Sequence, residues 1–254
     1  MSVFTRHGGA FVATTHSAGP WDPRSQHGGA PAALLTRELQ ALAPELRVAR
    51  ATFELLGPVP VGPVEVRAAV VKPGRRFRLA EAELAVDGRV VVRARAVLLR
   101  RAAVTEPTGE RPLPCPPPDA LEPVRFPSSG EGFHLTAMEL RDAGGTWAGA
   151  GAARTWFRLR RELVAGEGPA TGAALAAAVA DFGNGTSFVL PFDGWLFVNT
   201  DLTVHLHRDP EGPWVLLEAR TTIGPDGAGL ASSALYDERG EVGLAAQSLY
   251  VDRR

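Results

Sequence analysis

The first half of the chain changes from a helical to an extended hydrophobic pattern. The segment GGAPAALLTRELQALAP, which starts at Gly28, carries leucines at near-helical spacing and predicts one helix. Pro31 suits its first turn, where the missing N–H would have no partner anyway. Four runs typical of strands follow, separated by Gly-Pro, Pro-Gly and Asp-Gly turn signals: residues 48–56, 64–71, 76–86 and 90–100. The pattern predicts one helix followed by an antiparallel meander.

The second half of the chain repeats this order. Residues 169–179 (PATGAALAAAV) predict a second helix of small residues, and strand-like runs follow at 198–207, 215–223, 230–236 and 242–251. Two turn residues of the first half, Gly74 and Asp87, have counterparts 150 positions later in Gly224 and Asp237. We therefore expect two copies of one unit of about 100 residues each.

A long helix wrapped by a curved antiparallel sheet, occurring twice, is the double hotdog architecture of the α+β class. One such unit leaves a sheet edge and a helix face uncovered, and here the second copy supplies the cover within the same chain. Residues 105–129 are rich in proline, which is typical of an extended linker across a surface. The expected domains are an N-terminal hotdog unit at 1–104 and a C-terminal hotdog unit at 130–254.

Composition narrows the classes of function. The chain has 254 residues, 45% of them hydrophobic, and its 27 basic and 28 acidic residues leave no charge excess for a nucleic acid or an anionic membrane. One cysteine excludes a disulfide framework and a cysteine-based zinc site. No apolar run reaches ~18 residues, and the first residues lack a secretory pattern. We therefore expect a cytoplasmic protein without membrane insertion.

Three polar residues of the second copy interrupt apolar surroundings. Asp181 follows a run of small and apolar residues, where a carboxylate is costly unless it is hydrogen-bonded or used, and its charge opposes the dipole of the helix that it ends. Asn199 opens a strand whose polar face continues with Asp201 and Thr203, and Gln247 shares its face with apolar residues. The purely structural alternatives are a solvated helix end for Asp181, a solvent-facing row of polar side chains for Asn199, and a hydrogen-bonded core amide for Gln247.

The residues just before the first helix form a second candidate site. Two glycines, Gly28 and Gly29, expose backbone N–H groups and let a ligand approach closely, which suits a developing oxyanion or a phosphate. His27 is a candidate acid or base near neutral pH. The alternative is an ordinary glycine-rich helix start, with His27 as part of the turn.

Four segments, in this order and spacing, resemble the tandem-hotdog acyl-CoA thioesterases of the thioesterase II-like group: QHGGAPAALL (26–35), AAVADFGNG (177–185), FVNTDLTVHLHR (197–208) and LAAQSLYV (244–251). The resemblance extends over nearly the whole chain and implies hydrolysis of an acyl-CoA to the free acid and CoA. In that family an Asp, a Thr or Asn, and a Gln position a water molecule, and the matching residues are Asp181, Asn199 and Gln247. The best-known members carry Thr at the position of Asn199.

The residue types suit this chemistry. A thioester carbonyl is already activated, so Asp181 can serve as general base for water while Asn199 and Gln247 orient it. No G-x-S-x-G nucleophile elbow occurs, and no metal or separate cofactor is expected, since CoA is part of the substrate. In the first copy we place Arg50 and Arg95 at the positions of Asn199 and Gln247, which predicts a single site per chain. The exposed sheet edges also predict a homo-oligomer.

Two other functions are compatible with the fold. Asp22 and His27 are five residues apart, a spacing that resembles hotdog enoyl-thioester hydratases and dehydratases, although the Gly-Asp-x-Asn-Pro signature of those enzymes is absent. A non-catalytic acyl-thioester-binding protein is the other alternative, because one fold hosts both kinds of function. Loss of the enoyl group of crotonyl-CoA without thiol release would indicate the first, and binding without turnover the second.

Overall fold

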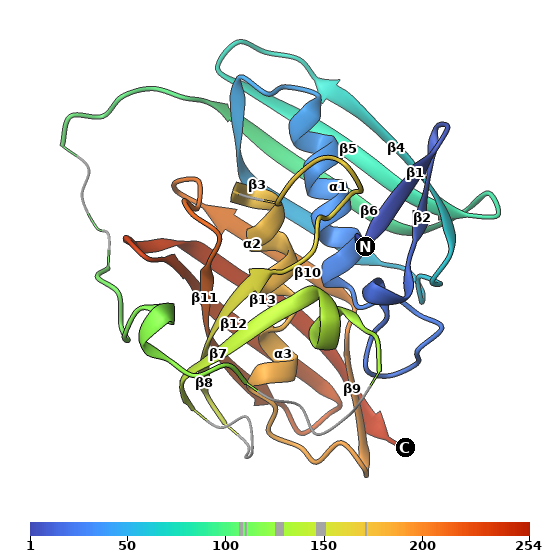
Figure 1. The fold of residues 1–254 in the computed structure, drawn as a ribbon, viewed down its shortest axis with the longest axis vertical. Coiled ribbons are helices and arrows are strands. Elements are labelled where there is room, and N and C mark those ends of the chain that lie inside the picture. The colour runs from blue at the N-terminus through green and yellow to red at the C-terminus, as the bar shows by residue number, and fades with distance from the viewer. Residues whose placement is uncertain (107–108, 110, 125–129, 146–150, 171) are drawn as a thin grey trace.

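The computed structural model describes residues 1–106, 109, 111–124, 130–145, 151–170 and 172–254 (Figure 1). Parts of the expected linker, at 107–108, 110 and 125–129, lie outside the described residues. The first copy is a helix followed by a four-stranded antiparallel meander, as the hydrophobic pattern predicts. Its elements are α1 (Gly29–Ala41), β3 (Leu46–Leu55), β4 (Pro63–Lys72), β5 (Phe77–Val86) and β6 (Arg89–Arg100), with the strands in the spatial order β4-β5-β6-β3.

The second copy has the same plan. It consists of α2 (Gly172–Ala180), the short helix α3 (Gly183–Thr186), β9 (Trp195–Asn199), β10 (Asp201–Leu206), β11 (Val215–Ile223), β12 (Ala228–Asp237) and β13 (Gly240–Arg253). Its strand order is β11-β12-β13-β10, which matches the first copy element by element. The predicted double hotdog fold is therefore confirmed.

Each sheet is extended by a hairpin at its outer edge. The hairpin of β1 (Phe4–His7) and β2 (Ala10–Ala13) pairs with β4, and the hairpin of β7 (Met138–Gly145) and β8 (Ala153–Leu159) pairs with β11. Short helical turns complete the described elements: η1 (Thr15–Ser17), η2 (Pro118–Ala120) and η3 (Phe133–Ala137). No helix among the described residues is long and apolar enough to cross a membrane.

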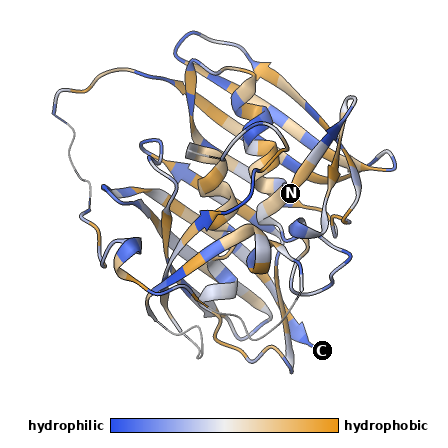
Figure 2. Ribbon diagram, viewed as in Figure 1, coloured by the Kyte–Doolittle hydropathy of each residue, from blue (hydrophilic) through white to orange (hydrophobic). Residues whose placement is uncertain are grey.

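The two sheets join through their inner edges. β3 of the first copy pairs antiparallel with β10 of the second, with Ala51 opposite Val204. The strands of the described residues thereby form one 13-stranded sheet. Along these strands hydrophobic and hydrophilic residues alternate (Figure 2), as expected when one face covers a core. An isolated first copy would leave the edge of β3 unpaired, so each copy completes the other.

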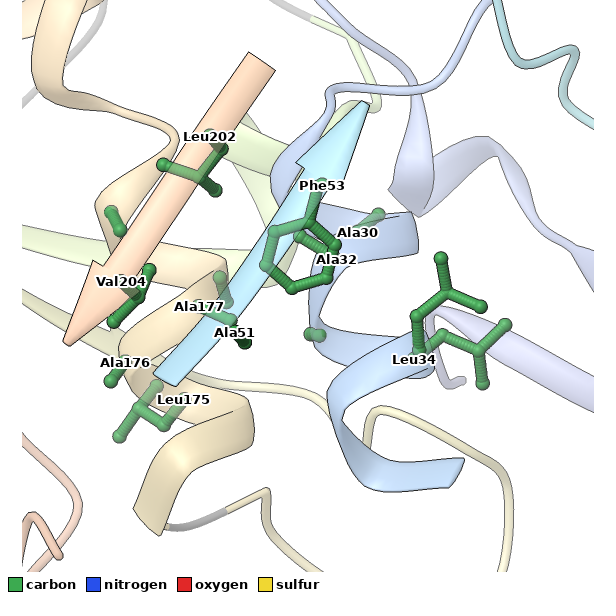
Figure 3. Close-up of a cluster of buried hydrophobic side chains, with 14 of the residues drawn as sticks. Ala30, Ala32, Leu34, Ala51, Phe53, Leu175, Ala176, Ala177, Leu202 and Val204 are labelled. Atoms are coloured by element: carbon green, nitrogen blue, oxygen red, sulfur yellow. The ribbon is translucent and has the colours of Figure 1, made fainter. Parts of the chain in front are cut away.

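The helices α1 and α2 pack against each other in the middle of the molecule (Figure 1). Both helices carry buried alanines, and Figure 3 shows four of them beside β3 and β10: Ala30, Ala32, Ala176 and Ala177. Because these side chains are small, the two helix backbones approach closely. The N-terminal end of α1 thereby reaches the C-terminal end of α2, where an added Cβ at Gly29 would lie 2.5 Å from the carbonyl oxygen of Ala178.

The strand that follows each helix carries the same irregularity. In β3 the pairing with β6 shifts by one residue between Val48 and Arg50. In the second copy the predicted strand at 198–207 divides at Thr200 into β9 and β10, and the pairing with β13 shifts by one residue there. The predicted alternation across this strand is therefore wrong, because an extra residue exchanges the two faces. Asn199 lies on the inward side of β9 and does not share the outward stripe of β10.

The described part of the linker packs on the outer face of the second sheet. The indole N–H of Trp156 donates to the carbonyl oxygen of Pro116 at 3.0 Å. Linker side chains cover a small buried cluster there: Leu113, Cys115 and Leu121 against Trp156, Trp214, Leu216 and Tyr236. The thiol of Cys115 is half-buried, and this burial raises its pKa. The cysteine thus has a packing environment and lacks the features of an activated nucleophile.

Candidate active site

Asp181 is the residue directly after α2, and its side chain is only 5% exposed. The helix before it, GAALAAAVA, buries every residue from Leu175 to Ala180, so the chain delivers the carboxylate into the interior. A buried carboxylate needs hydrogen-bond donors. The amide of Asn199 donates from Nδ2 to Oδ1 at 2.8 Å, and Nδ1 of His27 lies 2.8 Å from Oδ2.

Gln247 holds this carboxylate from β13. Its side chain is 1% exposed on the inward face of the strand. The amide Nε2 lies 3.4 Å from Oδ1 of Asp181 and 3.3 Å from its main-chain oxygen, and Oε1 accepts the backbone N–H of Asn184 at 3.0 Å. A Cβ at Gly183 would lie 2.9 Å from this Oε1, so a larger residue there would displace the amide. Every polar atom of the Gln247 amide is therefore used within the protein, which makes Gln247 a positioning residue for Asp181.

The N-terminus of α1 closes the site from the first copy. A Cβ at Gly28 would lie 2.9 Å from both carboxylate oxygens of Asp181, so only glycine allows this approach. The backbone N–H of Gly29 also faces the carboxylate and is one of the groups that lower its pKa. The charge of Asp181, which opposes the dipole of its own helix, thus sits at the positive end of the neighbouring helix. This packing resolves the conflict that the sequence shows at Asp181.

The pKa of Asp181 reflects opposing effects. Burial raises it, but the adjacent His27, the amide of Asn199 and the N–H of Gly29 together lower it below the ordinary value. The carboxylate is therefore ionised at neutral pH. A buried, charged carboxylate surrounded by oriented donors is the arrangement expected at a catalytic site.

Aromatic side chains fix the ring of His27. It stacks on Phe182 with 4.3 Å between ring centroids, and Phe133 of η3 lies 5.4 Å away. The next residue of η3, His134, is partly buried, and this burial together with the nearby His27 lowers its pKa to about 4. The imidazole of His27 thus packs in a cluster with two aromatic rings, with its Nδ1 atom against Asp181.

The structure brings all six candidate residues of the sequence to one place: Asp181, Asn199, Gln247, His27, Gly28 and Gly29. The two candidate sites inferred separately from the sequence are thus one site, built from the start of α1 and the end of α2. Sequence reasoning missed that His27 contacts Asp181, because the two residues are far apart in the chain. The HGG segment before the helix was the available signal.

Asp22, proposed as a partner of His27 in a hydratase, lies elsewhere. Its carboxylate accepts hydrogen bonds from the side chain and backbone of Arg24 in an exposed loop, including one from Nη2 at 2.9 Å. The carboxylate that His27 contacts is that of Asp181. Asp22 and His27 therefore do not form a pair in the structure, although they are five residues apart in the sequence.

The first copy holds apolar residues at the equivalent positions. The hairpins β5–β6 and β12–β13 contain the same bulge, which gives them a common register. In this register Ala96, which pairs with Ala80, corresponds to Gln247, which pairs with Ala231. Counted in the same way, Val48 opposite Leu98 matches Asn199 opposite Leu249. The residue directly after α1 is Leu42, so no carboxylate directly follows this helix as Asp181 follows α2.

The prediction that Arg50 and Arg95 are the first-copy counterparts of Asn199 and Gln247 is therefore wrong. Arg50 lies beyond the bulge of β3, and Arg95 points outward, where its exposed guanidinium pairs with Glu81. Counting from the strand ends fails because the two copies end differently, whereas the bulges give a common register. Within the described residues, the polar constellation occurs in the second copy and is replaced by aliphatic side chains in the first.

Both halves of the chain match models of known protein families. Residues 17–99 match the model of the acyl-CoA thioesterase N-terminal domain, and residues 112–251 match that of the acyl-CoA thioesterase C-terminal domain. A comparison with curated protein sequences finds no match.

Several solved structures share the fold over nearly the whole chain. A protein of Novosphingobium aromaticivorans that is assigned as a thioesterase is 22% identical, with a TM-score of 0.76 and 98% of both chains covered. A conserved hot dog fold protein of unknown function from Alicyclobacillus acidocaldarius is 18% identical, with a TM-score of 0.76 and coverage of 98% and 95%. The acyl-CoA thioesterase II TesB2 of Mycobacterium marinum is 14% identical, with a TM-score of 0.69 and coverage of 98% and 94%. With both of its halves matched in order, the chain belongs to the acyl-CoA thioesterase family and is a thioester hydrolase.

Proposed function

We propose that this protein hydrolyses an acyl-CoA to the free acid and CoA at the site around Asp181. The observation that carries the proposal is the convergence of an ionised, buried carboxylate with the N-terminus of α1. The carboxylate supplies the charge for general-base delivery of water, and the helix N-terminus supplies donors for the thioester carbonyl. Both elements are needed for attack on an acyl carbon.

The backbone N–H of Gly28 is the donor best suited to the carbonyl oxygen. It donates to no backbone carbonyl in the described part of the chain, whereas the N–H of Ala30 already bonds to His27. Preorganised N–H groups at a helix N-terminus stabilise the negative charge that develops on the carbonyl oxygen during attack. Next to it, Oδ1 of Asn199 accepts no hydrogen bond within the described residues, so it is available to orient the attacking water.

The experiment is a thiol-release assay over a panel of acyl-CoA substrates, with the Asp181→Asn variant beside the wild type. We expect hydrolysis by the wild type and a loss of about 100-fold or more in the variant, because the base loses its negative charge. No residual activity from a second site is expected, since the first copy carries Leu42, Val48 and Ala96. Near-wild-type turnover by a folded Asp181→Asn protein would contradict the assignment.

Two control measurements separate the alternative functions. Crotonyl-CoA reports hydration as loss of enoyl absorbance without free thiol, and acyl-CoA binding without thiol release at any chain length reports a binding protein. Either outcome would replace the hydrolase proposal for this site. Hydrolysis of the panel, with every loss of enoyl absorbance matched by release of free thiol, supports it.

The homo-oligomer expected from the sequence stays a prediction. On the outer face of β12 and β13, three large apolar side chains are each about half exposed: Leu230, Leu244 and Tyr250. These residues lie on neighbouring strands, with Leu230 opposite Ser248 and Leu244 opposite Ala234. This apolar surface lies apart from the sheet edges, β1 and β7, on which the prediction rests.

A further inference from the structure

The carboxylate of Asp181 already receives several hydrogen bonds inside the protein. Oδ1 accepts the amide of Asn199 and lies near that of Gln247, Oδ2 faces Nδ1 of His27, and the backbone N–H of Gly29 points to the same group. Four N–H donors engage nearly all the lone pairs of one carboxylate. A carboxylate stabilised in this way is a weak base, and its side chain is 95% shielded from solvent.

His27 has the opposite arrangement. Its Nδ1 atom lies 2.8 Å from Oδ2 of Asp181 and 3.1 Å from the backbone nitrogen of Gly29. It cannot donate to one and accept from the other at once. The shorter contact, to a charged oxygen, places the proton of a neutral imidazole on Nδ1, so the lone pair is on Nε2. Within the described residues nothing is hydrogen-bonded to Nε2, and the side chain retains 10% exposure.

We propose that His27 is the general base of the proposed hydrolysis, with Asp181 holding its tautomer and balancing the charge that it gains. This inference rests on the proposed function and changes the role expected for Asp181 from proton acceptor to positioning residue. The stacking of the ring on Phe182, with 28° between planes, holds Nε2 in one direction. An oriented imidazole on a buried carboxylate is a recurrent proton-transfer unit in acyl transfer.

The reaction balances with these groups alone. Water attacks the thioester carbon through its oxygen while one of its protons moves to Nε2 of His27, and the carbonyl electron pair moves onto the oxygen near the N–H of Gly28. When the carbonyl forms again, the C–S bond breaks and its electron pair leaves with the sulfur of CoA. The proton on Nε2 then passes to this thiolate, which gives free thiol and carboxylic acid and returns His27 to its neutral form.

The groups facing His27 determine the pH dependence. Asp181 lies at the end of α2, and His134 on η3 is held neutral, with a pKa of about 4. A base that is an imidazole loses its activity once it is protonated, because Nε2 then has no lone pair to accept the proton of water. A base that is the carboxylate keeps its activity down to the acid range, because the pKa of Asp181 is lowered.

The test is the pH profile of kcat/KM for the full chain with a good acyl-CoA, measured for the wild type, His27→Gln and His205→Gln. We expect kcat/KM of the wild type to fall about tenfold per pH unit once the imidazole base is protonated. His27→Gln should lose about 100-fold or more at pH 8 and should lack this acid limb. His205 is exposed on β10, so its variant serves as the matched control with an unchanged profile.

A second variant separates chemistry from structure. His27→Ala opens space at the site, and added imidazole should restore part of its activity in proportion to the concentration of free imidazole base. A flat wild-type profile down to about pH 5, or wild-type activity in a folded His27→Gln protein, would overturn the proposal while leaving the thioesterase function intact. Absence of thiol release from every substrate by the wild type would overturn the thioesterase function itself, and this inference with it.

Discussion

Replacing Gly28 with alanine tests the packing between the two copies without changing any charge. The backbone of Gly28 is already helical, with φ −58° and ψ −24°, so alanine introduces no backbone strain. Its Cβ, however, would lie 2.9 Å from both carboxylate oxygens of Asp181 and 3.1 Å from Cγ. The substitution therefore acts on the position of the Asp181 carboxylate.

The size of the effect follows from these distances. Ordinary contacts of a Cβ begin near 3.4 Å, so the carboxylate must move by about 0.5 Å (3.4 − 2.9) away from α1. A displacement of ~1 Å at a catalytic group costs about 100-fold, so half that displacement is expected to lower kcat/KM roughly tenfold. Stability should change by less than about 1 kcal/mol, because alanine reduces the entropy of the unfolded chain and offsets weakened hydrogen bonds.

The assay is thiol release together with thermal unfolding, and two other glycines provide the comparison. An added Cβ at Gly29 would lie 2.5 Å from the backbone oxygen of Ala178, so Gly29→Ala must separate the helices and should cost about 1–3 kcal/mol. Gly57 has no atom within 4 Å of such a Cβ, and Gly57→Ala should change neither activity nor stability. Wild-type kcat/KM in Gly28→Ala would refute the close approach of α1 to Asp181.

Two further predictions concern buried polar groups of the second copy. Gln247→Met leaves the N–H of Asn184 without its acceptor, which should lower the free energy of unfolding by about 1–3 kcal/mol in urea titrations and reduce turnover; unchanged values would show that the amide is dispensable. Burial raises the pKa of Asp237, but hydrogen bonds from Arg208 and two backbone N–H groups lower it by more. The net pKa of Asp237 is therefore below the ordinary value. Its contribution to stability is therefore present at neutral pH and is lost as the pH falls through this lowered pKa. Asp237→Asn should destabilise the protein by about 3 kcal/mol at pH 7 and flatten the loss of stability below about pH 4, and an equal acid slope in both proteins would contradict this.

Local sequence signals identified the parts of the site but not their contacts. Asp181 stands out because a carboxylate after a run of alanines conflicts with burial, and Gln247 because an amide interrupts an apolar strand face. Both conflicts have the same resolution, since the two side chains meet each other and Asp181 also meets the start of α1. The contact between His27 and Asp181 spans 154 positions (181 − 27), and no local pattern encodes such a pair.

The strand containing Asn199 shows where periodicity fails. Alternation assigns Asn199 and Asp201 to one face, but the bulge at Thr200 separates them. The same bulge in β3 displaced the expected first-copy counterparts and led to Arg50 instead of Val48. A one-residue shift reverses every side chain of a strand, and its position depends on pairing with a neighbour that the sequence pattern does not reveal.

The sequence by itself determined the helix and strand order, the duplication and the identity of the polar residues, because these depend on local periodicity and on residues that violate it. Only the tertiary structure decided that one helix N-terminus faces the end of the other helix, and so which groups surround Asp181. Small alanine side chains permit that approach, but the direction and register of two packed helices follow from the whole sheet that encloses them. The roles of His27 and Asp181 therefore depend on packing between the two copies, which neither copy contains alone.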